Sequence, residues 1–458
     1  MFPIPICGVV DIAFIMLYNI RMNVKDVIEI DIESSGMDGE GVARYDGKVV
    51  FVPYTLQGER VRAVVKSVKK NYATASVIKI LSPSPSRVEP DCPHYYKCGG
   101  CDTRHLSDDY RRAVLVGELE NNLKKIAGLS VTPTEFVSSS TPRRNKIAMP
   151  FGCKDGHVVL GMYRKNSHVV EPVDCLFASE RMREVVRTVC EFADEYKLPA
   201  YDERSSKGLL RHLVMREAGE RLSVALVVAA DGFEGESVLS GRLPSFCDFF
   251  ICPNTAKNNV IMGSSARLVK GNERLKVNVL GVSAELSPLS FFQVNDEIRD
   301  RLYLDAIGEM TAPTLVDLYS GIGITSNLAA RKCDKVYGVE CVPQAVVDAD
   351  RTAAANGNAD KIINTCGDVE KVLPMLGISG DMDILVDPPR KGCGAPVMTE
   401  IAKLRPSKLI YISCNHATMC RDIRIFLDAV DGYSLTACRV YDMFPCTHHV
   451  ETLCVLSK

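Results

Sequence analysis

Apolar runs and amphipathic segments alternate along the last third of the chain, from Pro313 onward. Short apolar runs are typical of buried strands, and longer segments with apolar residues every three or four positions are typical of helices. Strands are predicted at 315–319, 335–340, 362–366, 384–387 and 409–413, and helices at 324–332, 343–356, 395–404 and 419–430. This alternation predicts an α/β fold with a doubly wound, mainly parallel sheet.

The middle of the chain, residues 133–285, has the pattern of short strands interrupted by a helix at 179–196. Several segments are rich in arginine: 143–146, 163–165 and 211–216. Alternation in the last of these predicts a strand with one polar face. Basic strands could line an RNA groove, or their arginines could form ordinary surface salt bridges, and the sequence leaves both interpretations open.

Short strands punctuated by glycines predict a small β-barrel over residues 23–81. The stretch from Asp26 to Asp46 is mainly acidic, whereas basic residues follow with no acid after Glu59. Tyr72 lies within the basic run, as binding of single-stranded RNA would require, and a solvated barrel face is the alternative. Repeated proline and serine at 82–86 predict a linker.

The N-terminal residues 1–22 are largely apolar but fit no targeting signal. No basic residue precedes the apolar run, and Pro3, Pro5 and Asp11 interrupt it. The segment is therefore a poor signal peptide and a poor membrane span. We expect an extension from an over-extended translation start, with a monotopic membrane anchor as the alternative.

Composition narrows the class of protein without naming it. The 458 residues, 46% hydrophobic and 24% charged, are ordinary for two or three globular domains. A net charge of −2 argues against an overall basic coat but not against a local basic face. The 18 cysteines are scattered in a chain too large to need disulfides, so we expect a cytoplasmic protein with metal-binding or catalytic cysteines.

Three cysteines and two glycines are concentrated in one short segment: Cys92-x5-Cys98-Gly-Gly-Cys101. The glycines allow the backbone to wrap tightly around a compact inorganic group. Cys175 or Cys153 could supply a fourth ligand for an iron–sulfur cluster, whereas His105 would indicate zinc. The spacing predicts a metal site and leaves the choice between zinc and iron–sulfur open.

A predicted strand is followed by a turn containing Gly321 and Gly323 and then by a helix, as in nucleotide-binding folds. The next strand ends in Glu340, which is placed to bind two ribose hydroxyls. Such a turn also suits a dinucleotide, but Ser326 occupies the place of the third glycine. S-adenosylmethionine is therefore favoured, and Asp368 after a later strand could hold its adenine amino group.

Ser413-Cys414-Asn415 ends a predicted strand, at the edge of the sheet where α/β proteins bind ligands. Cys414 could be one more buried small hydrophobe. Beside a methyl donor, however, its thiolate could add to C6 of uracil and make C5 electron-rich enough to take a methyl group. Loss of the C5 proton then requires a base, for which Glu451 is a candidate and His448 and His449 are rivals.

Five motifs carry a resemblance to a known family: Phe291-Phe-Gln-Val-Asn295, Asp317-Leu-Tyr-Ser-Gly-Ile-Gly323, Asp387-Pro-Pro-Arg-Lys-Gly392, Ser413-Cys-Asn415 and Phe444–Glu451. With these motifs, residues 23–458 resemble the RNA uridine-5-methyltransferase family, and most closely its iron–sulfur 23S rRNA members. Gly36–Arg44 resembles the core of a TRAM domain, a small RNA-binding barrel.

The resemblance implies that Cys414 is the nucleophile and Glu451 the general base. Asp387 would assist catalysis and contact the flipped base together with Phe291, and Arg390 would contact the RNA. The implied cofactor-binding residues are Gln293, Asp317, Tyr319, Gly321, Gly323, Glu340, Asp368 and Asp387. The implied ligands of a [4Fe–4S] cluster are Cys92, Cys98, Cys101 and Cys175.

The predicted architecture is an α/β, Rossmann-like class I methyltransferase domain at 286–458, an OB-like TRAM β-barrel at 23–81, and a central iron–sulfur α+β domain at 88–285. We expect a monomer that binds RNA and no membrane. The resemblance favours 23S rRNA as the substrate, and tRNA is the alternative.

Two further classes of protein are weighed against this one. A radical-type iron–sulfur methylthiolase would have the spacing C-x3-C-x2-C, whereas the spacing here is C-x5-C-x2-C. A non-catalytic RNA-binding module is opposed by the intact Cys414 and Glu451. Two residues depart from the family pattern. Ser320 replaces a cysteine, which should be neutral, and His416 replaces a proline, which could alter the turn that holds Cys414.

Overall fold

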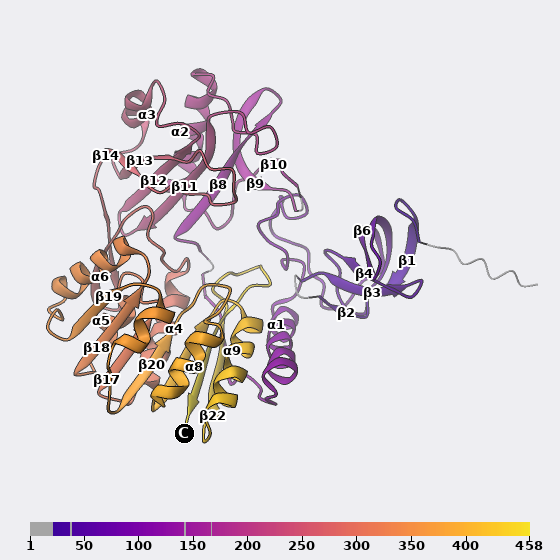
Figure 1. Ribbon diagram of the computed structural model, residues 1–458. Coiled ribbons are helices and arrows are strands. Elements are labelled where there is room, and N and C mark those ends of the chain that lie inside the picture. Colours follow the sequence, from indigo (N-terminus) through magenta and orange to yellow (C-terminus); the bar gives the residue numbers. More distant parts are fainter. Residues whose placement is uncertain (1–21, 37–38, 142, 166) are drawn as a thin grey trace, which may run out of the picture. The chain divides into compact units, whose positions relative to one another are not determined.

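The computed structural model describes residues 22–36, 39–141, 143–165 and 167–458, which form two compact units (Figure 1). The first unit ends at Arg87 and the second begins at Val88. The predicted N-terminal extension lies outside the described residues, except for Met22. Across the described residues, no helix has the length and apolar character that a membrane crossing requires.

The first unit is a six-stranded sheet in the order β1-β5-β6-β4-β3-β2. Its strands are β1 (Val27–Asp31), β2 (Ser34–Ser35), β3 (Gly41–Tyr45), β4 (Lys48–Val52), β5 (Arg60–Val68) and β6 (Tyr72–Ser82). Among the described residues no ladder joins the edge strands β1 and β2, so the predicted barrel is not closed. The reason is local, because β2 has two residues, which pair with β3 and offer too short an edge for a closing ladder.

Basic residues of β5 face acidic residues of β1 on the exposed side of this sheet. Arg62 is the register partner of Glu29, and Nη2 of Arg62 lies 2.7 Å from Oε1 of Glu29. Arg60 lies 3.9 Å from its own register partner, Asp31. The acidic and basic stretches that are separate in the sequence are therefore interleaved in space here.

A buried glutamate fastens the predicted linker to the first unit. Oε1 of Glu59 lies 2.6 Å from Nε of Arg87 and accepts a hydrogen bond of 3.2 Å from the backbone N of Ser84. Because Glu59 is fully buried, this ion pair is shielded from solvent, and it holds the proline- and serine-rich segment against the sheet.

The C-terminal sheet of the second unit has eight strands in the order β19-β18-β17-β20-β21-β23-β22-β7. Its strands are β7 (Glu135–Val137), β17 (Thr314–Leu318), β18 (Lys335–Glu340), β19 (Ile362–Cys366), β20 (Met382–Val386), β21 (Lys408–Ser413), β22 (Ser434–Tyr441) and β23 (Glu451–Ser457). Strands β17 to β21 are parallel, and β23 runs antiparallel to both β21 and β22.

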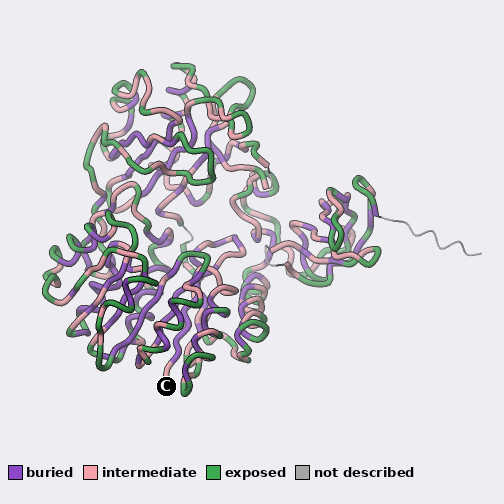
Figure 2. The backbone as a smooth tube through the Cα atoms, in the orientation of Figure 1, coloured by how far each residue is buried: buried purple, intermediate pink, exposed green. Residues whose placement is uncertain are grey.

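Helices cover both faces of this sheet, and Figure 2 shows its strands as mainly buried. They are α4 (Asp296–Glu309), α5 (Ile324–Ala329), α6 (Pro343–Ala355), α7 (Val369–Val372), α8 (Ala395–Leu404) and α9 (His416–Ala429). One core contains Ile384 and Val386 with residues of α7, α8 and α9, and the other contains Leu385 with residues of α4 and α5. All five residues of β20 are buried, as in a parallel sheet covered on both faces, which confirms the α/β prediction.

The other large sheet of the second unit has the order β10-β9-β8-β11-β12-β13-β14. Its strands are β8 (Lys146–Lys154), β9 (His157–Tyr163), β10 (Val170–Pro172), β11 (Leu210–Ala218), β12 (Arg221–Val228), β13 (Cys247–Pro253) and β14 (Arg267–Lys270). Helices α2 (Glu180–Glu195) and α3 (Glu236–Arg242) accompany it, and a hairpin of β15 (Leu275–Val279) and β16 (Val282–Leu286) follows.

The strand predicted at 211–216 is present as β11, but neither of its faces is exposed. Its residues from Leu210 to Arg216 are all buried, because separate apolar clusters cover the two faces of the sheet. Nη1 of Arg211 donates to the carbonyl oxygens of Asn254, at 2.9 Å, and of Ala256, at 2.8 Å. Protein groups thus hold Nη1 of this arginine inside the fold, although its Nε has no hydrogen-bond partner among the described residues, and the side chain does not line an exposed groove.

Segments that follow the cysteine-rich stretch are built into the C-terminal sheet. Helix α1 (Asp108–Asn122) and the π-helical turn after it (Leu123–Ala127) place Leu119 and Leu123 in the same core as α9. Strand β7 adds an eighth strand, parallel to β22. Residues 108–137 therefore pack with the C-terminal sheet, and the domain boundary near residue 285 stays a prediction.

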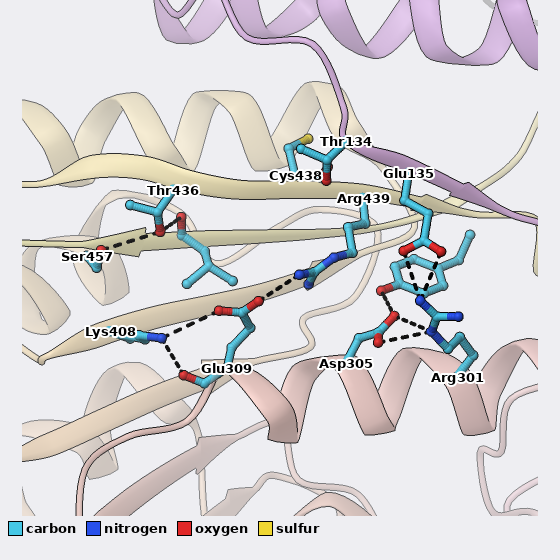
Figure 3. Close-up of polar contacts among 12 residues, drawn as sticks. Thr134, Glu135, Arg301, Asp305, Glu309, Lys408, Thr436, Cys438, Arg439 and Ser457 are labelled. Atoms are coloured by element: carbon cyan, nitrogen blue, oxygen red, sulfur yellow. Dashed lines mark hydrogen bonds and ion pairs between the residues drawn. The ribbon is translucent and has the colours of Figure 1, made fainter.

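Ion pairs clamp α4 to the β7 edge of the sheet (Figure 3). Nη2 of Arg301 lies 2.9 Å from Oε1 of Glu135, and Nε of Arg301 lies 2.8 Å from Oδ2 of Asp305 (Figure 3). The hydroxyl of Tyr441, the last residue of β22, donates to Asp305 at 2.7 Å. This network fixes the strand end that leads into the segment before Glu451.

Candidate active site

Strand register places the two main predicted catalytic residues side by side. In the antiparallel pair β21–β23, Ser413 is the partner of Thr452. The next residue outward on one strand is Cys414, and on the other it is Glu451. Glu451 also pairs with Tyr441 of β22, so strands flank it on both sides. Two residues 37 positions apart in the sequence therefore meet at one edge of the sheet.

The turn that carries Cys414 is held by its two neighbours. Ser413 Oγ donates to the carbonyl oxygen of Asn415 and accepts from the backbone N of Asn415, both at 3.0 Å. Asn415 caps helix α9, because its Oδ1 accepts hydrogen bonds from the backbone N of Ala417, at 3.1 Å, and of Thr418, at 3.3 Å. Cys414 thus projects from a rigid strand-to-helix turn with His416 as the first helical residue.

Carboxyl groups around Cys414 set its ionisation. Burial, followed by the charges of Glu451 and Asp387, raises the pKa of the Cys414 thiol to about 11, and Arg390 opposes this effect. The thiol is therefore mostly protonated in the ligand-free protein at neutral pH. A positively charged ligand, or protonation of a neighbouring carboxylate, would lower this pKa and favour the nucleophilic thiolate.

Glu451 is a buried carboxyl with spare hydrogen-bonding capacity. Its residue is 3% exposed, and its Oε2 atom has no hydrogen-bond partner among the described residues. Burial and the charge of Asp387 raise the pKa of Glu451 well above its usual value, although Arg390 opposes them. A carboxylate in such surroundings accepts a proton more readily than an exposed one.

Asp387 follows β20 at the same edge of the sheet. Its backbone N donates to the carbonyl oxygen of Leu318 at 3.3 Å. Burial, then the charge of Asp317, raises the pKa of Asp387 to about 7. Tyr303 of α4 lies within electrostatic reach of this carboxyl, and burial and the charge of Asp387 raise the pKa of Tyr303. Asp387 therefore stands between the Cys414–Glu451 pair and the glycine turn.

The glycine turn is organised by two acidic residues. Oδ2 of Asp317 accepts hydrogen bonds of 2.6 Å from the hydroxyls of Thr325 and Ser326, which ties β17 to the start of α5. Oε2 of Glu340 accepts from the backbone N of Gly321 at 3.1 Å. Gly323 has φ 77° and packs against Ala349, a conformation that favours glycine.

The other residues predicted to bind the cofactor or the substrate lie on separate segments of the chain. Tyr319 directly follows β17, and Asp368 caps α7 by accepting from the backbone N of Glu370 at 3.2 Å. Gln293 is buried, and its carbonyl oxygen accepts from Nδ2 of Asn145 at 2.9 Å. Phe291 is 75% exposed, so its ring is available to an incoming ligand.

The two histidines considered as rival bases are engaged with other groups. Nδ1 of His448 lies 2.6 Å from Oδ2 of Asp102, and Nε2 of His449 lies 3.4 Å from Nη2 of Arg390. Asp102 directly follows Cys101 of the cysteine-rich segment, and sequence reasoning did not single it out. The 346 positions between Asp102 and His448 explain why, because no pattern in a single sequence reports such a contact.

The four predicted cluster ligands lie within electrostatic reach of one another. Burial raises the pKa of Cys98 to about 11, and the neighbouring thiols that add to this effect are Cys101, Cys175 and Cys92. The backbone N of Gly100 donates to Sγ of Cys98 at 3.3 Å. Of the two cysteines considered as a fourth ligand, Cys175 belongs to this group. Among the described residues, no three His, Cys, Asp or Glu side chains are arranged to hold a single metal ion.

Gly99 is required where the cysteine segment crosses β9. Its backbone N donates to the carbonyl oxygen of Tyr163 at 2.9 Å, and a Cβ atom at this position would lie 2.5 Å from the same oxygen. His105, which would have indicated zinc, is fully buried, with its Nδ1 2.6 Å from the hydroxyl of Tyr95.

Comparisons with known proteins agree with this arrangement. Residues 21–78 match the TRAM domain family, and residues 379–458 match the family described as tRNA (Uracil-5-)-methyltransferase. An uncharacterized RNA methyltransferase of Halalkalibacterium halodurans is 36% identical over 453 residues, which cover 95% of this chain and 98% of the relative. Another, of Caldanaerobacter subterraneus subsp. tengcongensis, is 33% identical over 453 residues, with 96% and 99% covered.

A solved structure is also similar along nearly the whole chain. It is the Pyrococcus abyssi tRNA (uracil-54, C5)-methyltransferase in complex with S-adenosyl-L-homocysteine, with a TM-score of 0.75 and 25% sequence identity. The similarity covers 93% of this chain and 99% of that one.

The α/β sheet with its glycine turn, together with the TRAM domain, defines a methyltransferase that uses S-adenosylmethionine and acts on RNA. Within that class, the chain belongs to the RNA (uracil-5-)-methyltransferase family.

Proposed function

We propose that the protein methylates C5 of a specific uridine in RNA through a covalent bond between Cys414 and C6 of the base, and that 23S rRNA is the substrate. The observation that carries the proposal is the register of β21 and β23, which sets Cys414 beside Glu451. A nucleophile and a base at one strand edge, next to the glycine turn, are the parts that this reaction requires.

The residues around the glycine turn fit the proposed cofactor. Glu340 would bind the ribose hydroxyls, Asp368 the adenine amino group, and Gln293 the methionyl part of S-adenosylmethionine. When bound, this cofactor supplies an electrophilic methyl group, and its positive charge suits the acidic surroundings that Asp317 and Asp387 provide.

In the first chemical step, Cys414 forms the bond that activates the base. After the thiol loses its proton to solvent, the Cys414 thiolate adds to C6 of the uracil, and the electron pair of the C5–C6 double bond forms the new bond from C5 to the methyl group. The methyl group would leave the sulfonium sulfur of the cofactor, whose bonding electron pair stays on that sulfur to give S-adenosylhomocysteine. Asp387 would hold the uracil edge, and Phe291 would stack on the flipped base. Extraction of the uridine from its stack requires a few kcal/mol, which is least in an RNA loop.

In the second step, Glu451 removes the proton from C5. The electron pair of the broken C–H bond restores the C5–C6 double bond, and the C6–S bond breaks to regenerate Cys414. Glu451 is a better candidate than His448 or His449 because its Oε2 atom has no hydrogen-bond partner among the described residues, whereas each histidine lies beside another polar group.

The choice between two RNA substrates separates two versions of the proposal. The resemblance in the motifs favours 23S rRNA, whereas the similarity to the Pyrococcus abyssi tRNA (uracil-54, C5)-methyltransferase favours tRNA as the second candidate. Purified protein would be incubated with labelled S-adenosylmethionine and either RNA, and the product would be mapped by mass spectrometry. We expect 5-methyluridine in 23S rRNA. Modification of tRNA alone would refute the rRNA version, and no 5-methyluridine in either RNA would refute the proposal itself.

We also propose that Cys92, Cys98, Cys101 and Cys175 hold a [4Fe–4S] cluster with a structural role. Four thiols within electrostatic reach and a backbone N–H directed at Cys98 Sγ suit such a cluster. Protein purified without oxygen should contain iron and sulfide in equal amounts and lose both in Cys98→Ser. Stoichiometric zinc would contradict this assignment.

A further inference from the structure

The segment Asp442–Val450, which we call the base loop, joins β22 to Glu451, the first residue of β23. The cysteine-rich segment contacts this loop through its backbone. The backbone N atoms of Asp102 and Thr103 both donate to the carbonyl oxygen of Cys446 at 3.1 Å. Because Asp102 directly follows Cys101, the base loop rests on the end of the cysteine segment.

An arginine of α1 binds the base loop at two residues, Asp442 and Thr447. Nη1 and Nη2 of Arg111 lie 2.6 Å and 2.7 Å from the two carboxylate oxygens of Asp442. Nη2 of Arg111 also donates to the carbonyl oxygen of Thr447 at 3.0 Å. Both partners of the ion pair are buried, and a bidentate pair of this kind fixes orientation as well as distance.

A second contact lies closer to Glu451. Oδ2 of Asp102 lies 2.6 Å from Nδ1 of His448, and the side chains are 15% and 17% exposed. The His448 ring lies 4.0 Å, between centroids, from the ring of His449, which contacts Arg390. The chain of contacts therefore runs from the cysteine segment to Arg390, and the charge of Arg390 acts on both Cys414 and Glu451.

Cys414 and Glu451 depend on different supports. Cys414 is held by the Ser413–Asn415 turn and the cap of α9, as described above. Glu451 begins β23, so its position follows from the strand and from the base loop directly before it. A disturbance of the base loop should therefore move Glu451 and leave Cys414 in place.

We propose that Asp102 and Arg111 are positioning residues for Glu451, and that through the base loop they set the distance between its carboxylate and C5 of the substrate. The inference rests on the proposed function. If the Glu451 carboxylate is misplaced, it cannot remove the proton from C5. No electron pair is then released to restore the C5–C6 double bond, and the C6–S bond to Cys414 persists. The enzyme would then accumulate as a covalent adduct with methylated RNA.

The test is Asp102→Ala, which removes the contact with His448 and keeps the backbone N–H that binds Cys446. Purified enzyme would be mixed with RNA and S-adenosylmethionine labelled in the methyl group. Three quantities would be measured: kcat, KM for RNA, and the fraction of enzyme in a denaturation-resistant adduct that carries the label. We expect kcat to fall roughly tenfold to a hundredfold with KM little changed, because a small misplacement of a catalytic group has effects of this size. The labelled adduct should increase.

Matched variants separate positioning from a general loss of structure. Asp102→Asn keeps an oxygen acceptor for His448 and should recover most of the activity. His448→Gln breaks the same contact from the loop side and should reproduce the adduct accumulation if Asp102→Ala does not fold. Asp109→Ala removes an exposed acid from the first turn of α1 and should behave as wild type.

Two results would overturn the inference. One is an unchanged kcat in both Asp102→Ala and His448→Gln, and the other is a parallel fall of turnover and adduct, which indicates general damage. The proposed function would fail differently, because the wild type itself would then transfer no label to uridine.

Discussion

Replacement of Asp387 by asparagine removes a carboxyl group that the folded protein keeps protonated up to about neutral pH. Burial and the charge of Asp317 raise its pKa from 3.8 to about 7. An acid with a raised pKa binds its proton more tightly in the folded state than in the unfolded state. Its contribution to stability is therefore present below about pH 4 and is lost as the pH rises through about 7.

The size of the effect follows from the two pKa values of Asp387. One pKa unit corresponds to about 1.4 kcal/mol, so a rise from 3.8 to about 7 gives at most about 4 kcal/mol. The charge of Asp387 also raises the pKa of Glu451, so the two carboxyls titrate together. Part of the free energy calculated for Asp387 therefore belongs to Glu451, and the value is an upper limit. We therefore expect Asp387→Asn to be more stable than wild type by up to about 4 kcal/mol at about pH 8 and nearly equal to it at about pH 4.

The assay is urea unfolding of both proteins across this pH range, followed by circular dichroism. Asp431→Asn, in an exposed turn before β22, serves as the matched control and should show no such pH dependence. If the stability difference between Asp387→Asn and wild type were the same at both ends of the range, the charge-based explanation would be refuted. A gain in stability at the expense of activity is what an acidic active site predicts.

Three further changes test other parts of the structure. Arg111→Met leaves the carboxylate of Asp442 buried and unpaired, so the free energy of unfolding should fall by about 3–5 kcal/mol in urea titrations, and an unchanged value would contradict the ion pair. Burial lowers the pKa of Lys146 to about 8 from 10.5, so the folded state binds fewer protons and wild-type stability should rise between those pH values. Lys146→Met should raise the melting temperature at pH 7 and remove that rise. Gly99→Ala brings a Cβ atom within 2.5 Å of the Tyr163 carbonyl oxygen, so it should reduce the iron content of purified protein, whereas Gly117→Ala, in open space on α1, should retain it.

The C-terminal sheet could be predicted because its strands are short apolar runs separated by amphipathic helices. Periodicity also located Ser413-Cys414-Asn415 at a strand end, where Asn415 now proves to cap α9. Periodicity could not show, however, that Glu451 lies next to Cys414 across the sheet. The pairing of β21 with β23 depends on a strand that enters antiparallel after β22, and a single sequence does not report register.

The errors arose where tertiary contacts overrode a local pattern. Alternation at 211–216 predicted a strand with one polar face, whereas β11 is buried on both faces and Arg211 donates to backbone carbonyls at Asn254 and Ala256. The strand pattern at 23–81 predicted a barrel, but closure depends on the length of an edge strand, and β2 is too short. The contact between Asp102 and His448 joins residues 346 positions apart, so the local sequence pattern could not predict it.

The central claim is a transient bond between Cys414 and a uracil ring, and a trapped adduct tests it most directly. RNA with 5-fluorouridine at the target position has fluorine in place of the proton that Glu451 must remove, so the reaction should stop after methyl transfer. Digestion and mass spectrometry should then find one methylated nucleotide attached to the peptide that contains Cys414, and no adduct in Cys414→Ala. Attachment to another residue, or an adduct that persists in Cys414→Ala, would contradict the account.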